Sequence, residues 1–109
     1  MDKPAGLSVH AGVGTGEKTL VDFLLEKFPD IKSVGDAPDI RPGIVHRLDK
    51  ETSGVMIVAR NQKTFEFLKD LFKNRNIEKK YLAVVHGKFK EKEGRDEGEM
   101  GRSKKDFRK

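Results

Sequence analysis

The sequence predicts an α+β fold with two helices and a mixed, mainly antiparallel sheet. Residues 17–28 and 62–74 repeat apolar side chains at three- and four-residue steps, which is typical of amphipathic helices. Around them lie short apolar or alternating runs bounded by glycine and proline, which predict strands. The predicted strands are residues 7–9, 44–45, 55–59 and 80–87. The order strand, helix, strand, strand, helix, strand is compatible with an α/β arrangement as well.

The N-terminal segment predicts a turn, a short strand and the first helix. Residues 4–6 combine a proline, which fixes one backbone angle, with a glycine, which relaxes another, so they mark a turn before the strand. Residues 12–16 contain three glycines and form a flexible loop ahead of the helix, which Pro29 ends. The apolar face of this helix consists of Leu20, Phe23, Leu24 and Phe28.

The middle of the chain places a polar loop between two apolar runs. Residues 33–42 contain too many glycines and prolines for a regular element and predict an irregular lead-in. The runs 44–45 and 55–59 predict a pair of strands that hold residues 46–54 in place. A polar loop supported by strands in this way is a candidate active-site loop, with Asp49 at its centre.

The C-terminal part predicts a second helix, a strand and a charged segment. The apolar face of the helix consists of Phe65, Leu68, Leu71 and Phe72. Residues 80–87 alternate in the manner of a strand, in which Tyr81 is either a half-buried aromatic or, beside Lys79 and Lys80, a platform for base stacking. Residues 88–109 hold nine Lys/Arg and six Asp/Glu and predict a mobile segment. We therefore expect a folded part over residues 1–87 followed by this charged segment.

Composition narrows the class of protein. The 109 residues correspond to one domain or part of one, and 38% charged against 35% apolar residues is polar for a domain of this size. A net charge of +5 favours a polyanionic partner such as RNA or DNA. The chain has no cysteine, no apolar run long enough to span a membrane and no secretory signal. These features predict a cytoplasmic protein without a membrane partner.

Neither a cofactor nor a metal is expected from the motifs. A nucleotide-binding loop requires a lysine directly after its last glycine, whereas Glu17 separates Gly16 from Lys18 here and would repel a phosphate. The three histidines do not have the spacing of a metal-ligand set. They are His10, His46 and His86, and hydrogen bonding at a strand end is the expected role of the last two.

Asp49 is the candidate catalytic residue of the polar loop. Arg47 and Lys50 beside it favour the ionised carboxylate and attract phosphate. Glu51 is the other carboxylate of the loop that fits this role, and the residues alone do not decide between Glu51 and Asp49. An ordinary solvated turn is the alternative, since Asp, Thr and Ser are common turn formers.

Three motifs resemble one enzyme family. His46 to Gly54 reads HRLDKETSG, with RPGIV before it and VMIVA after it, and is similar to the signature of the RluA-type pseudouridine synthases. Residues 2–10, DKPAGLSVH, resemble the family's first motif, and residues 79–83, KKYLA, its third. The resemblance runs to about Gly87 and implies that the fold is part of a pseudouridine synthase catalytic domain.

The resemblance implies an activity and roles for individual residues. The activity is the isomerisation of uridine to pseudouridine in structured rRNA or tRNA, without a metal or other cofactor. Asp49 matches the nucleophile, which attacks either C1′ of the ribose or C6 of the uracil, and Tyr81 matches the active-site tyrosine that stacks on the flipped base. Arg47 matches the residue that fills the vacated space in the RNA. The predicted RNA-binding residues are His46, Arg47, Lys50, Lys79, Lys80 and Arg102.

The resemblance covers only the N-terminal part of the family's catalytic domain. We therefore expect a truncated domain that is inactive alone, or that self-associates or pairs with a complementary half because its sheet edges are exposed. The alternative is a small basic RNA-binding module without chemistry. That alternative explains the charge of the chain but not the HRLD loop.

Overall fold

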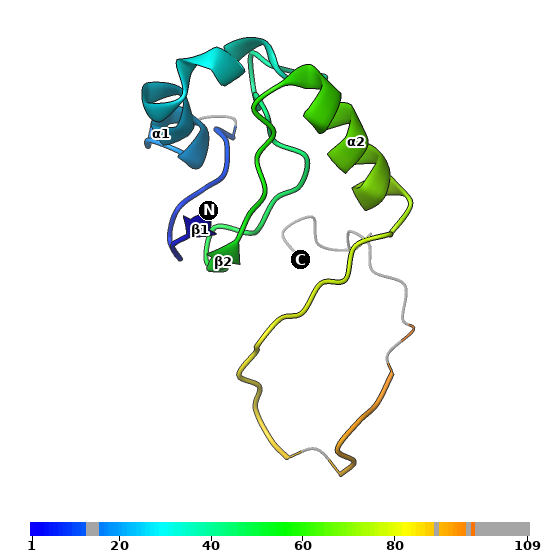
Figure 1. Ribbon diagram of the computed structural model, residues 1–109. Helices are drawn as coiled ribbons and strands as arrows, with labels where there is room; N and C mark the ends of the chain where they lie inside the picture. Colours follow the sequence, from blue (N-terminus) through cyan, green and yellow to red (C-terminus); the bar gives the residue numbers. More distant parts are fainter. Residues whose placement is uncertain (13–15, 89, 96, 98–109) are drawn as a thin grey trace, which may run out of the picture. The chain divides into compact units, whose positions relative to one another are not determined.

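A computed structural model describes residues 1–12, 16–88, 90–95 and 97 (Figure 1). The chain divides into two units, Met1–Lys79 and Lys80–Lys109, and each is considered by itself. All helices and strands of the described residues belong to the first unit. They are β1 (Asp2–Lys3), α1 (Leu20–Lys27), the 3-10 helix η1 (Pro29–Ser33), β2 (Gly54–Val55) and α2 (Gln62–Lys73). The α+β prediction with two α-helices and an antiparallel sheet is confirmed at this level.

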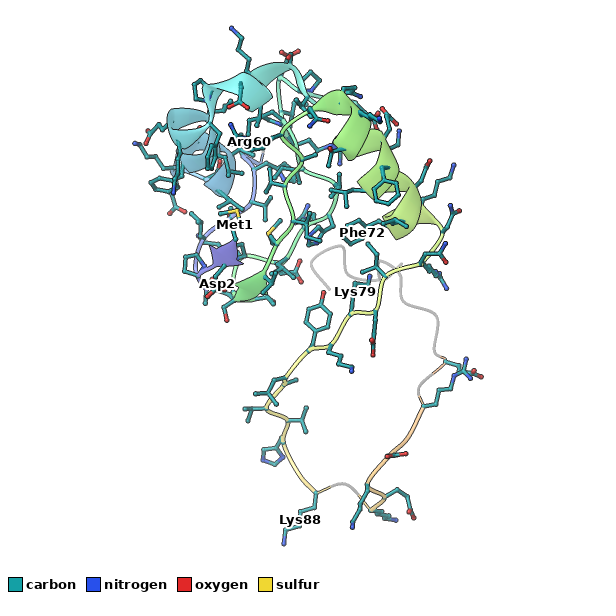
Figure 2. All side chains as sticks on the ribbon, viewed as in Figure 1. Met1, Asp2, Arg60, Phe72, Lys79 and Lys88 are labelled. Atoms are coloured by element: carbon teal, nitrogen blue, oxygen red, sulfur yellow. The ribbon has the colours of Figure 1, made fainter. Side chains whose placement is uncertain are left out.

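The sheet is short and joins the N-terminus to the segment after the polar loop. β1 and β2 are antiparallel, with Asp2 opposite Val55 and Lys3 opposite Gly54. Met1 extends the ladder, because its carbonyl accepts from the Met56 N–H at 2.8 Å and its amino group donates to the Met56 carbonyl at 2.9 Å. Met1 and Asp2 accordingly lie alongside β2 (Figure 2). The prediction of a strand at residues 7–9 was wrong, since the strand forms before the turn.

Residues 8 and 9 instead support the start of α1. The N–H groups of Leu20 and Val21 donate to the carbonyls of Ser8 and Val9 at 2.9 and 3.0 Å. α1 begins at Leu20 rather than at residue 17, because Thr19 donates from both its N–H and its hydroxyl to the Asp22 carboxylate at 2.7 Å. These two hydrogen bonds lower the pKa of Asp22. A local cap therefore sets the helix start more sharply than the apolar periodicity does.

α2 has the predicted position and the predicted apolar face. The Asn61 side chain caps its first turn by accepting from the Thr64 N–H at 2.9 Å. At the other end Arg75 adopts a φ of 55°, and the Asn76 N–H bonds back to the Leu71 carbonyl at 2.9 Å. This is the Schellman arrangement that commonly ends helices, here with an arginine in the place usually taken by glycine.

The core of the first unit consists of two groups of buried side chains. The larger group contains Val9, Leu20, Val21, Leu24, Ile31, Ile44, Leu48 and Met56. The smaller group contains Val34, Ala59 and Phe65 and fixes α2 to the segment after β2. The two groups meet the same stretch of chain, because Met56 and Ala59 both belong to residues 54–59 and both are fully buried. That stretch is the central support of the unit.

The predicted pairing of residues 44–45 with 55–59 is partly present. Ile44 and Val58 form an isolated antiparallel bridge, and the Ala59 N–H donates to the Gly43 carbonyl at 2.9 Å. The bridge does not continue into a ladder because the Gly43 N–H turns away to the Val34 carbonyl at 2.8 Å. The polar loop is nevertheless closed at its base by this bridge.

The prediction of a strand at residues 80–87 was wrong. All eight residues are described, and none belongs to a strand. Leu82 and Val84 on one face are completely exposed, and Tyr81 and Val85 on the other are 65% and 53% exposed, so neither face is buried in the described part of the chain. Alternation alone does not make a strand, because a strand also needs a neighbour that accepts its hydrogen bonds.

No helix among the described residues is long and apolar enough to cross a membrane. The charged segment predicted at residues 88–109 falls largely on residues 98–109, which lie outside the described part of the chain.

The close approach of Gly43 to Ala59 predicts a large effect of Gly43→Ala. Gly43 has a φ of +69°, and a Cβ there would overlap the Ala59 carbonyl oxygen and crowd Val58. Strain and overlap together should destabilise the chain by roughly 2–4 kcal/mol. Urea unfolding of the variant measures this. Gly16→Ala, where nothing among the described residues lies within 4 Å of the added Cβ, is the matched control and should change stability little. Equal stabilities of the two variants would contradict the packing described here.

Candidate active site

The polar loop alternates between the core and the solvent. Leu48 is buried, with only 7% of its surface exposed, and belongs to the larger core group. Its neighbours Arg47 and Asp49 are exposed. The Thr52 N–H donates to the Asp49 carbonyl at 3.1 Å and closes a turn directly after the carboxylate. Leu48 thus anchors the loop from below while Arg47 and Asp49 face outward on either side of it.

A buried lysine attaches the N-terminal turn to this loop. Lys3 is fully buried, and its ammonium donates to the carbonyls of Pro4 at 2.8 Å, Leu7 at 2.8 Å and Lys50 at 3.1 Å. The Lys50 carbonyl also accepts from the Gly6 N–H at 2.8 Å. Because an ammonium has three donors, all of them are satisfied by carbonyl oxygens. The residue after Asp49 is therefore fixed by two hydrogen bonds from the N-terminal turn.

The side chain of Lys50 points to a different partner. Its ammonium forms an ion pair with Glu17 at 3.0 Å, and this contact raises the pKa of Lys50. Both side chains are largely exposed, so the pair contributes little to stability. Its effect on the site is electrostatic, since Glu17 offsets the charge of a lysine that the sequence predicted to bind RNA.

His46 supports the loop from the side of α2. Its Nε2 accepts from the Ile57 N–H at 3.0 Å, so the imidazole is neutral and carries its proton on Nδ1. The ring stacks on Phe72 of α2, with 4.4 Å between ring centres and 19° between planes. Burial, followed by the charge of Lys79, lowers the pKa of His46. Phe72 and Lys79 both lie near the C-terminal end of α2 (Figure 2).

The structure brings together some of the predicted site residues, while the others belong to the second unit or lie outside the described residues. His46, Arg47, Asp49 and Lys50 lie in one loop, and Lys79 lies near enough to act on His46. Lys80 and Tyr81 belong to the second unit, in which Tyr81 is 65% exposed. Arg102 lies outside the described residues. Within the described ranges, no group of three or more His, Cys, Asp or Glu is arranged to hold a metal ion.

Sequence reasoning missed Lys3, Phe72 and the pair formed by Glu17 and Lys50 as parts of this site. A lysine next to proline and glycine is normally read as a solvated turn residue, and nothing local indicates that its ammonium is buried. Phe72 was predicted as a core residue of the second helix, but its contact with His46 depends on the tertiary fold. Only the position of Lys3 within the first motif pointed toward a role near the loop.

Comparison with known proteins identifies the group to which this loop belongs. The sequence profile described as RNA pseudouridylate synthase matches residues 1–109. "Ribosomal large subunit pseudouridine synthase D" of Borreliella burgdorferi is 45% identical over 89 residues, which are 82% of this chain and 27% of that protein. The protein of the same name from Xanthomonas campestris pv. campestris is 47% identical over 87 residues, 80% of this chain and 25% of that protein.

A third relative covers nearly the whole chain. "Uncharacterized RNA pseudouridine synthase YlyB" of Bacillus subtilis is 40% identical over 106 residues, which are 97% of this chain and 34% of that protein. The chain therefore spans about a quarter to a third of the length of the curated relatives it matches.

Replacing Lys3 by methionine tests the attachment of the loop. Methionine has a similar length but no donor, so the substitution leaves the carbonyls of Pro4 and Leu7 without the ammonium and removes one of two bonds to Lys50. Loss of charged hydrogen bonds in a buried position should destabilise the chain by roughly 2–4 kcal/mol. Urea unfolding measures the loss. Lys32→Met at an exposed position is the control, and a Lys3→Met variant as stable as that control would rule out the proposed attachment.

The lowered pKa of His46 predicts that stability falls in mild acid. As the pH drops through the ordinary value of 6.5, the unfolded chain takes up a proton before the folded chain does. The stabilisation is therefore complete above pH 6.5 and declines until the pH passes the lower pKa of the folded state. His10, whose pKa is also lowered, acts in the same direction.

Urea midpoints of the parent and of His46→Gln between neutral and mildly acidic pH measure this effect. The variant keeps an acceptor for the Ile57 N–H but cannot titrate, so its midpoint should depend less on pH. His86→Gln, at an exposed position, should keep the pH dependence of the parent. Identical pH profiles for the parent and His46→Gln would show that the imidazole titrates alike in both states.

Proposed function

The chain belongs to the RNA pseudouridylate synthase family, and from this premise we propose that it carries the nucleophile of a site that isomerises uridine to pseudouridine in RNA. The observation that carries the proposal is that Asp49 is exposed while its loop is anchored on both sides. Leu48 before it is buried, and the Lys50 carbonyl after it accepts a hydrogen bond from the buried Lys3 ammonium. A carboxylate held in this way meets the need of a nucleophile for access and for a fixed position.

The proposed reaction needs no other reagent. Asp49 attacks C1′ of the ribose or C6 of the uracil, and the bond between N1 and C1′ breaks. The base then rejoins the ribose through C5 and the bond to the Asp49 carboxylate breaks, while C5 loses its proton and N1 gains one, so that atoms and charge balance. A transient adduct divides this exchange into two easier steps. The target uridine must leave its stack to reach the carboxylate.

Two further residues have proposed roles in holding the RNA open. Arg47 projects from the same loop as Asp49 and is exposed, which suits a side chain that fills the space left by the flipped base. Tyr81 is exposed in the second unit and offers an aromatic face on which the flipped uracil stacks. Lys79 and Lys80 supply positive charge in the intervening chain.

The proposed substrate is structured RNA of the cytoplasm, either rRNA or tRNA. The names of the relatives from Borreliella and Xanthomonas refer to the large ribosomal subunit, which favours rRNA for this chain. The net charge of +5 supports a polyanionic substrate.

Exposed apolar side chains support a need for a further polypeptide. Val55 and Ile57 point away from the core and are 76% and 42% exposed. In the second unit Leu82 and Val84 are completely exposed. Because the matched region is about a quarter to a third of each relative considered above, the rest of the family's domain is the proposed cover for these residues. A second copy of the chain is the competing cover.

Tritium release from RNA labelled at uracil C5 tests the proposed activity. The chain is assayed alone and mixed with the remaining part of the Bacillus subtilis relative, using rRNA and tRNA as substrates. Asp49→Asn should lower release by at least ~10³-fold, because it removes the nucleophile without changing its shape. Its affinity for RNA should stay within about threefold of the parent or rise, since the substitution removes a negative charge.

Glu51→Gln is the matched control, because Glu51 is an exposed carboxylate of the same loop. It should retain most of the activity. If Glu51→Gln were inactive and Asp49→Asn active, the nucleophile would be assigned wrongly. If the parent bound RNA but released no tritium, either alone or mixed with the remaining part of the relative, the chain would be an RNA-binding module without chemistry.

A further inference from the structure

The backbone and the side chain of Lys50 are held by different parts of the chain. Its carbonyl accepts from the buried Lys3 ammonium at 3.1 Å and from the Gly6 N–H at 2.8 Å. Its own ammonium donates to Glu17 Oε2 at 3.0 Å. Lys50 directly follows Asp49. The cation next to the proposed nucleophile therefore has a fixed backbone, while its side chain is directed toward a carboxylate on the surface.

The contact between Lys50 and Glu17 is readily exchanged. The two side chains are 47% and 74% exposed. Exposed ion pairs contribute little to stability, because salt screens them and two long side chains lose freedom when they pair. Lysine carries its ammonium on a flexible four-carbon stem, so the ammonium can move to another anion while the backbone stays in place. Replacing Glu17 by a different anion therefore leaves the Asp49 loop intact.

The pair of Arg60 and Asp30 shows the contrast with a firmly held cation. Arg60 donates to both oxygens of the Asp30 carboxylate, at 2.9, 3.1 and 3.3 Å. Its guanidinium also lies 4.6 Å from the centre of the Phe28 ring. Paired hydrogen bonds and an aromatic contact fix a guanidinium in one position. The Lys50 ammonium meets Glu17 through one oxygen only, which suits exchange rather than structural support.

We propose that Glu17 competes with RNA for Lys50, and that a backbone phosphate of the strand at the Asp49 loop displaces the Glu17 carboxylate from the Lys50 ammonium. One charge-assisted hydrogen bond is exchanged for another, and no covalent step is involved. In the free chain Glu17 occupies the ammonium and also repels an approaching phosphate. The inference rests on the proposed RNA substrate and gives Glu17 a role in limiting the affinity for it.

The exchange favours a nucleic-acid strand over a single small anion. A strand brings several phosphates, and each phosphate that the chain neutralises releases counterions. The free energy gained in this way exceeds the small contribution of one exposed ion pair. An isolated anion has only the single contact with Lys50 to gain, and Glu17 already provides that contact. Glu17 therefore lowers the affinity for RNA without preventing its binding.

A double-mutant cycle of Glu17→Gln and Lys50→Gln tests the competition. Binding of a short, fluorescently labelled oligouridylate is measured by fluorescence anisotropy at about 50 mM salt, where phosphate contacts are strong. Glu17→Gln should tighten binding about two- to fivefold, the range expected for the loss of one exposed ion pair. In the Lys50→Gln background this gain should disappear, because no ammonium remains to be released.

Glu26→Gln is the matched control. Glu26 pairs with Lys18 at 2.8 Å, the two side chains are 60% and 65% exposed, and neither residue belongs to the Asp49 loop. The substitution removes the same charge, so it measures the general effect of net charge on RNA binding. That effect should be smaller than the gain from Glu17→Gln and the same in the Lys50→Gln background. Glu17→Gln should also keep the urea midpoint of the parent, since an exposed pair adds little stability.

The outcomes separate this competition from the proposed enzyme activity. A gain from Glu17→Gln that depends on Lys50 supports the competition even if no tritium is released in the activity assay. Equal gains from Glu17→Gln and Glu26→Gln, a gain that persists in the Lys50→Gln background, a lowered urea midpoint of Glu17→Gln, or no binding of oligouridylate would each overturn it. Tritium release without coupling between Glu17 and Lys50 would overturn the competition and leave the proposed activity intact.

Discussion

The buried ammonium of Lys3 is the interaction on which the rest of the first unit depends. Among the described residues it has no carboxylate partner, so its desolvation is offset only by the carbonyls of Pro4, Leu7 and Lys50. The first two carbonyls belong to the N-terminal turn, and the third belongs to a loop 47 residues away in sequence. Burying the charge is favourable only when all three are in place, which couples the N-terminus to the Asp49 loop.

This coupling explains how a carboxylate can be both exposed and fixed. Asp49 is exposed, but Leu48 before it is buried and the carbonyl of Lys50 after it accepts two hydrogen bonds. On the other flank His46 joins Ile57 to Phe72 of α2. Each neighbour removes freedom from the backbone, so the side chain is accessible while the backbone that carries it is held. Such positioning is worth more to a nucleophile than burial, which would disfavour its charge.

The sequence allowed prediction of those features that depend on residues close together along the chain. α2 was placed almost to the residue because Phe65, Leu68 and Phe72 repeat at helical steps. The choice of Asp49 as nucleophile rests on the motif of its loop and stays a prediction. The start of α1 depended on the cap between Thr19 and Asp22, which competes with periodicity. The strand at residues 80–87 was wrong because pairing is not local. The role of Lys3 could not be predicted, since the acceptors of its ammonium are assembled only by the tertiary fold.

The distribution of charge around the loop resolves a conflict in the proposed chemistry. An exposed carboxylate repels the phosphates of the RNA that it must reach, and a net charge of +5 spread over the chain is screened beyond about 8 Å at physiological salt. Only cations close to Asp49 can offset that repulsion. Lys50 is paired with Glu17, whereas Arg47 is exposed in the same loop and forms no ion pair with a carboxylate of the described residues. The pairing of these few groups, rather than the overall basicity, is therefore what matters most for the RNA binding proposed above.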